Sequence, residues 1–170
     1  MMSQLIKNLT PAVNTWKMLE LAEGDSPESV TLPDGDVIVP FAVWQARKSE
    51  IISCHKRIGL LIQPDDPLEA LVADLDYFIV IAINFPRFVD GRGYSTASLL
   101  RQRHAYQGEL RAVGDVLHDQ LFFLHRVGFD SFVLKDGKNL AYAIEAGFSP
   151  FSDAYQTSTN QPQPYFRRRA

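Results

Sequence analysis

From residue 41 onwards, short apolar runs alternate with segments in which apolar positions recur every three or four residues. Apolar runs are typical of strands buried on both faces, and the three-to-four spacing is typical of helices that pack against a sheet. The expected strands are 58–62, 78–83, 109–113 and 129–134. The expected helices are 41–54, one that starts with Asp66 as its N-cap, 96–103, one from Asp115 as N-cap to Gly128, and 138–146.

This order predicts an α/β fold with about four to five mostly parallel strands alternating with helices, because strands joined through a helix pair in parallel. The pattern fits an open, flavodoxin-like sheet and also half of a (β/α) barrel. A half-barrel leaves sheet edges unpaired, so it would have to form a homodimer or cover those edges.

The two ends of the chain have a different character. Pro33-Asp34-Gly35-Asp36 is a tight-turn sequence between the apolar segments 30–32 and 37–39, which predicts an N-terminal β-hairpin. The segment 157–170 is rich in Thr, Ser, Asn, Gln and Pro, a composition typical of disorder. We therefore expect a single α/β domain over 1–156 and a disordered or loosely packed tail over 157–170.

Composition narrows the class of protein. A net charge of −3 provides no basic field for nucleic acid or anionic lipid, so neither is an expected partner. The longest apolar run, 77–83, is far shorter than the ~20 residues that a membrane helix needs. The single cysteine, Cys54, excludes an internal disulfide, and the N-terminus lacks the pattern of a secretory signal. These features together predict a cytoplasmic protein.

Candidate chemistry lies where predicted strands end, because parallel α/β folds bind ligands at the carboxyl ends of their strands. Three loops have this position: 85–95, 113–115 and 135–137. Arg92, between Gly91 and Gly93, has the fork geometry that binds oxyanions. The candidate ligand-binding residues are Asp90, Arg92, Tyr94, Ser95, Arg111 and Asp115.

These residues also have a purely structural interpretation. Asp90 and Arg92 would then pin their loop, and Ser95 would cap the following helix. Arg101, Arg103 and Arg111 more often form a solvated helix face and ion pairs than an anion clamp. In the ligand-binding interpretation, Arg92 would hold the anion, Asp115 would orient Arg111, and Tyr94 would donate a proton.

No cofactor or metal is predicted. Gly91-Arg92-Gly93 is not a dinucleotide-binding fingerprint, and no phosphate-binding lysine motif accompanies it. His118 and His125 are seven residues apart, which separates them by ~10.5 Å along a helix, so one metal could not bind both. No catalytic residue can be assigned from the sequence.

Several long motifs carry a family resemblance: 90–95, 99–101, 108–117, 119–121 and 128–130. In these the chain resembles the bacterial family known as domain of unknown function 934. Members are commonly encoded beside the haem-containing subunit of nitrite/sulfite reductase, and some are labelled probable oxidoreductases. The family brings no established site residues. This chain has Ser98 where arginine is frequent and Val127 where cysteine is frequent, which argues against a redox thiol there.

The resemblance implies a cytoplasmic accessory protein linked to assimilatory sulfite or nitrite reduction. Its expected partner is the sulfite reductase haemoprotein or its electron donor. Whether the chain is itself an enzyme, beyond this association with an oxidoreductase, stays open. The alternative is a small-molecule enzyme or sensor that binds an oxyanion at the loops 90–95 and 111–115.

Overall fold

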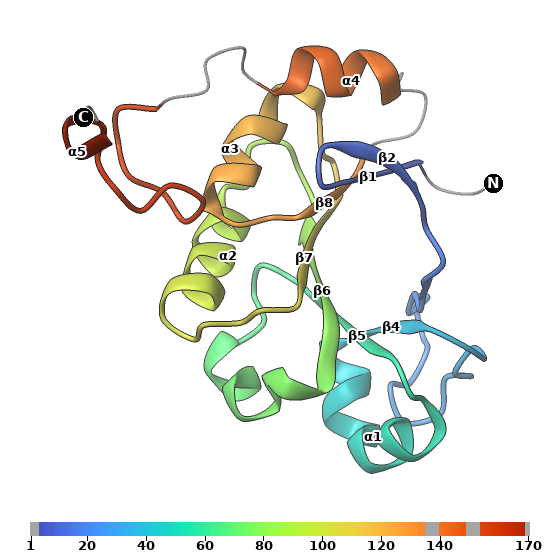
Figure 1. The fold of residues 1–170 in the computed structure, drawn as a ribbon. Coiled ribbons are helices and arrows are strands. Elements are labelled where there is room, and N and C mark those ends of the chain that lie inside the picture. The colour runs from blue at the N-terminus through green and yellow to red at the C-terminus, as the bar shows by residue number, and fades with distance from the viewer. Residues whose placement is uncertain (1–3, 135–139, 149–153, 169–170) are drawn as a thin grey trace.

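The computed structural model describes residues 4–134, 140–148 and 154–168. One mixed sheet of eight strands, open and curled like half of a barrel, forms the centre of the fold (Figure 1). Its spatial order is β2-β1-β8-β7-β6-β5-β4-β3. The strands are β1 (Gln4–Lys7), β2 (Thr10–Val13), β3 (Lys17–Met18), β4 (Val37–Pro40), β5 (Ile58–Ile62), β6 (Phe78–Phe85), β7 (Glu109–Gly114) and β8 (Ser131–Val133).

From β3 to β8, the order of the strands in the sheet is the same as their order in the sequence, and each neighbouring pair is parallel. This consecutive order is that of a half-barrel, whereas a flavodoxin-like sheet reverses its strand order. β1 pairs antiparallel with both β2 and β8. The prediction of four to five mostly parallel strands is therefore wrong in the size and uniformity of the sheet, because the N-terminal strands extend it.

Most of the helices connect successive strands and cover one face of the sheet (Figure 1), and the last two follow the final strand. They are α1 (Phe41–Cys54), the 3₁₀ helix η1 (Leu68–Tyr77), α2 (Arg92–Gln102), the short 3₁₀ turn η2 (His118–Gln120), α3 (Leu121–Val127), α4 (Leu140–Gly147) and α5 (Tyr165–Arg168). In the part of the chain that the structure describes, no helix has the length and apolar character needed to cross a bilayer.

The central strands of the sheet are buried on both faces. On β6, Ile81 and Ile83 belong to the core shared with the helices, whereas Val80 and Ala82 belong to a second cluster on the opposite face, here called the inner face. The indole of Trp16 lies on the inner face, close above Gly59. This two-sided burial explains why the strands are continuous apolar runs in the sequence.

Several predicted elements are confirmed. The helix 41–54 and the strand 58–62 match α1 and β5, and Gly128 ends α3 in the left-handed conformation with φ of 111°. β6 and β7 run one or two residues beyond the predicted strand ends. The predicted helix 138–146 corresponds to α4, although residues 138 and 139 lie outside the described part of the chain.

The hairpin prediction is wrong in its position. Residues 37–40 form β4, which pairs in parallel with β3 and β5, and residues 30–32 form no strand. The N-terminal hairpin is instead formed by β1 and β2. The chain does bend at 34–36, but this bend leads from a loop into β4 and does not connect two antiparallel strands.

Both aspartate N-caps predicted from the sequence are also wrong. The carboxylate of Asp66 accepts a hydrogen bond from the Gln63 amide at 2.7 Å, and η1 begins at Leu68 without a side-chain cap. The segment after Asp115 becomes helical only at His118. Asp66 thus binds an amide of its own loop, and Asp115 binds the Phe88 amide of the neighbouring loop.

The C-terminal segment runs beside α2 and α3 (Figure 1). The amide of Thr159 donates to the carbonyl of Arg126 at 3.0 Å, and the Gln102 amide group donates to the Thr159 hydroxyl at 3.1 Å. The division into a domain over 1–156 and a tail over 157–170 stays a prediction.

Candidate functional site

The loops that follow β6 and β7 leave the sheet at the same edge. Phe85 and Gly114 are opposite each other in the parallel pairing, and the Asp115 amide donates to the Phe85 carbonyl at 2.7 Å. The carboxylate of Asp115 in turn accepts a hydrogen bond from the Phe88 amide at 3.1 Å. We call residues 86–91 the rim loop. Asp115 thus fixes the rim loop from the neighbouring strand.

Arg92 fixes the other end of the rim loop. Its Nε and Nη2 donate to the carboxylate of Asp90 at 3.0 and 2.8 Å, and its Nη1 donates to Asp65. The hydrogen bonds from Arg92 lower the pKa of Asp90, and those to the two aspartates raise the pKa of Arg92. Two carboxylates therefore already balance the charge of the Arg92 guanidinium. This arrangement agrees with the structural interpretation, in which Asp90 and Arg92 hold the loop in place.

The rim loop also carries two exposed apolar side chains. Phe88 is 42% exposed and Val89 is 83% exposed. The backbone that carries them is held by Asp115 and by Gln120, whose amide donates to the Phe88 carbonyl at 3.3 Å. The loop thus uses its polar side chains to keep its shape and presents apolar side chains to solvent.

The two glycines beside Arg92 differ in whether the structure leaves room for a side chain. Gly91 has an ordinary φ of −85°, and a Cβ there would meet nothing within 4 Å. Gly93 lies in the first turn of α2, where a Cβ would stand 2.6 Å from Cζ of Phe85. Only Gly93 is required by close packing.

We expect Gly93→Ala to lower the free energy of unfolding by about 1–3 kcal/mol, because the methyl group overpacks the helix against β6. The matched variant Gly91→Ala should change it by about 0.5 kcal/mol or less. Urea denaturation of both variants measures the difference. Equal losses would contradict the assignment of close packing to Gly93 alone.

Tyr94 and Ser95 lie on α2 rather than in the loop, because the helix begins at Arg92 and not near residue 96. Tyr94 is half-buried, with its ring edge-to-face against Phe85 at 5.5 Å between centroids. Burial raises the pKa of Tyr94, against the opposing effect of a hydrogen bond with Gln120. Ser95 is exposed inside the first turn and does not cap the helix, whose N-cap is Gly91.

Arg111 is placed differently from the other candidates. It is only 2% exposed and lies in the middle of β7, with its side chain on the inner face. Its guanidinium donates to Glu109 at 2.7 and 2.9 Å and to Asn14 at 2.9 Å. The hydroxyl of Ser131 and the ammonium of Lys7 also donate to Glu109. The structure therefore does not bring Arg111 together with Arg92.

The six candidate residues therefore lie in three different parts of the structure. Asp90, Arg92 and Asp115 meet at the rim loop, Tyr94 and Ser95 follow on α2, and Arg111 belongs to the inner-face network. That any of them binds a ligand stays a prediction. The third candidate loop, 135–137, lies outside the described residues.

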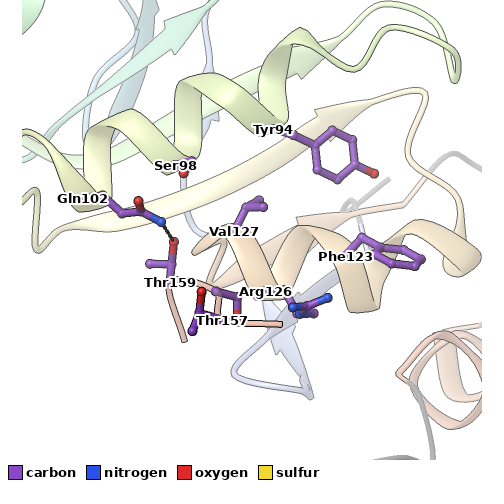
Figure 2. A pocket seen from close by; sticks show the side chains of 9 residues that line it. Tyr94, Ser98, Gln102, Phe123, Arg126, Val127, Thr157 and Thr159 are labelled. Carbon is purple, nitrogen blue, oxygen red and sulfur yellow. Dashed lines mark hydrogen bonds between the residues drawn. The ribbon is translucent and has the colours of Figure 1, made fainter. Parts of the chain in front are cut away.

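A cavity of about 450 Å³ lies between α2, α3 and the C-terminal segment (Figure 2). We call it the α2–α3 cavity. Nine residues from these three segments line it: Tyr94, Ser98 and Gln102 from α2, Phe123, Arg126 and Val127 from α3, and Thr157, Ser158 and Thr159. Of these, the sequence had singled out Tyr94 alone as a site residue. The four-residue spacing of Tyr94, Ser98 and Gln102 indicates that they share one face of α2. Nothing in the sequence indicates that residues 157–159 pack against that face.

Among the described residues, no three His, Cys, Asp or Glu side chains gather where they could hold a metal ion.

A model of a family described as bacterial protein of unknown function (DUF934) matches residues 59–166. No curated protein and no solved structure matches the chain. The matched span holds the rim loop, the inner-face residues of β7 and the α2–α3 cavity. Because this match covers more than half of the sequence, the chain belongs to the DUF934 family.

Proposed function

We propose that this DUF934 protein is a cytoplasmic accessory protein of assimilatory sulfite or nitrite reduction. It acts by docking on the haemoprotein reductase or on the electron donor of that reductase. The metabolic context comes from the resemblance described above, whose members are commonly encoded beside the haem-containing subunit. The docking role rests on the rim loop.

One observation carries the docking role: the rim loop is held rigid from within and presents apolar side chains outward. Phe88 and Val89 are exposed while Asp90, Arg92 and Asp115 are engaged in fixing the backbone. A preorganised loop loses little conformational freedom on binding, and exposed aromatic residues are the usual anchors of protein interfaces. These properties suit a binding surface better than a catalytic pocket.

The proposal is tested by measuring direct binding of the purified full chain to the purified haemoprotein reductase of the same cells, for example by biolayer interferometry. We expect saturable binding, and a lower reductase activity in cells that lack the chain. Absence of binding to both the reductase and its electron donor, with unchanged activity after deletion, would remove the proposal.

The alternative function is an oxyanion-binding enzyme or sensor that uses the loops 90–95 and 111–115. It is favoured by the shared edge from which the two loops emerge. It is weakened by the carboxylates that already match Arg92 and Arg111. Thermal-shift measurements with sulfite, sulfate and phosphate test it: stabilisation that Arg92→Ala abolishes supports it, and a flat result removes it.

A further inference from the structure

We propose that the α2–α3 cavity binds a small organic anion, with Arg126 as the group that holds its negative charge. This binding site is separate from the rim loop and independent of any reductase. The ligand class is a molecule with one carboxylate, phosphate or sulfo group on an aromatic or similarly flat apolar body.

The charge of Arg126 is the first argument. Three other arginines that are not exposed, Arg47, Arg101 and Arg111, each form a salt bridge, to Glu50, Asp130 and Glu109 respectively, whereas the half-buried Arg168 donates to the carbonyl of Ala154. Arg126 has no carboxylate partner within the described residues, and its Nη2 donates to the carbonyl of Gln156 at 3.0 Å.

The Nε of Arg126 strengthens this argument, because it is buried and has no hydrogen-bond partner among the described residues. Buried polar groups in folded proteins nearly always have a partner, and among the described side chains this nitrogen is one of three buried atoms without one, beside Nε2 of His104 and Nε of Arg168. An anion in the cavity would supply the missing negative charge for the guanidinium.

The rest of the lining defines the body of the ligand. Tyr94 and Phe123 provide aromatic surface from α2 and α3, and Val127 adds an aliphatic side chain from α3 (Figure 2). Ser98 and Thr157 add hydroxyl groups that can donate to an oxyanion or accept from a ligand hydroxyl. A volume of about 450 Å³ is in the usual range for small-molecule pockets.

The C-terminal segment completes the site. Thr159 is bonded to both helices, through the Arg126 carbonyl and the Gln102 side chain, so residues 157–159 form one wall of the cavity. A ligand would therefore bridge two helices and a segment that is distant in the sequence, and its binding should stabilise the contact between them.

The test is isothermal titration calorimetry of the full chain with phenyl phosphate, with phenol and inorganic phosphate as partial probes. We expect one phenyl phosphate per chain and affinities at least about tenfold lower for phenol and for inorganic phosphate, since each lacks one half of the recognised chemistry. Arg126→Gln should weaken phenyl phosphate binding by about tenfold or more. Arg103→Gln is the matched control, because it removes the same charge from an exposed position at the end of α2. This variant should bind phenyl phosphate with wild-type affinity.

A second variant guards against a folding defect in Arg126→Gln. Ser98→Phe keeps the arginine but fills the cavity from α2, so it should also abolish binding while the melting temperature stays near that of the wild type. The proposal is overturned if the wild type shows no saturable binding of phenyl phosphate. It is equally overturned if Arg126→Gln, or a folded Ser98→Phe, binds with wild-type affinity.

Discussion

Replacement of Glu109 by alanine should lower the free energy of unfolding by about 3–5 kcal/mol, the cost of leaving a buried charge without its partner. Arg111 is 2% exposed, and Glu109 is its carboxylate partner on the inner face of the sheet. Asn14 and Ser131 would remain as neutral partners, but neither carries a negative charge. The loss should appear in urea denaturation at neutral pH as a lower midpoint.

Glu50→Ala is the matched control. Glu50 also pairs with an arginine, Arg47, but its side chain is 49% exposed and solvent can replace the interaction. We expect a loss of about 1 kcal/mol or less for this variant. Similar losses for the two variants would show that the inner-face network does not stabilise the sheet.

The same network predicts a pH dependence. Burial acts to raise the pKa of Glu109, but hydrogen bonds from Lys7 and Ser131 and the charge of Arg111 outweigh burial and hold that pKa below its usual 4.5. A carboxylate with a lowered folded-state pKa contributes stability that is fully present above its unfolded pKa and is lost as pH falls through the folded value. Glu109→Gln should therefore lose less stability than the wild type as pH is lowered below about 4.5. Parallel pH profiles would contradict this assignment.

The double variant Phe88→Ser with Val89→Ser should weaken binding to the haemoprotein reductase by about thirtyfold or more, because exposed anchor residues commonly carry most of an interface's binding energy. Both side chains are already exposed in the free protein, so stability should change by about 0.5 kcal/mol or less per site. Biolayer interferometry with the full chain measures the affinity.

Val13→Ser is the control for the general effect of removing exposed apolar surface. Val13 is 70% exposed but lies on the edge strand β2, which β1, β8 and β7 separate from β6, the strand that leads into the rim loop. We expect wild-type binding for this variant. If Val13→Ser weakens binding as much as the rim-loop variant does, the docking surface has been assigned to the wrong part of the molecule.

The strands and the longest helix were predictable from the sequence because their apolar periodicity reports burial directly. The run at 58–62 is fully buried, the run at 78–83 is buried except for Ile79, and 41–54 buries Phe41, Val43, Trp44 and Ile51. The strands β2 and β3 were not predictable in this way. β2 is largely exposed, and β3 has only two residues, so neither leaves a pattern in the sequence.

The predicted helix starts were wrong where an aspartate carboxylate could accept a hydrogen bond either from a helix amide or from a loop amide. Asp66 and Asp115 each had the position of an N-cap, yet each binds a backbone amide in a loop instead. A side-chain oxygen satisfies any amide within reach, and tertiary structure decides which amide that is. Sequence spacing alone cannot make that choice.

The candidate site was partly predictable. Parallel pairing of β6 and β7 follows from the alternation of elements, and it places Asp90, Arg92 and Asp115 along one edge. The position of Arg111 on the inner face depends on strand register, which a short apolar strand does not reveal. The α2–α3 cavity depends on residues 157–159, whose composition gives no indication of packing.

The docking role of the rim loop is tested most directly by hydrogen–deuterium exchange of the full chain with and without the haemoprotein reductase. The proposal predicts that added reductase slows exchange at the backbone amides of residues 86–91 and leaves the strands β1 and β2 unchanged. Exchange in residues 86–91 that is the same with and without bound reductase would contradict it.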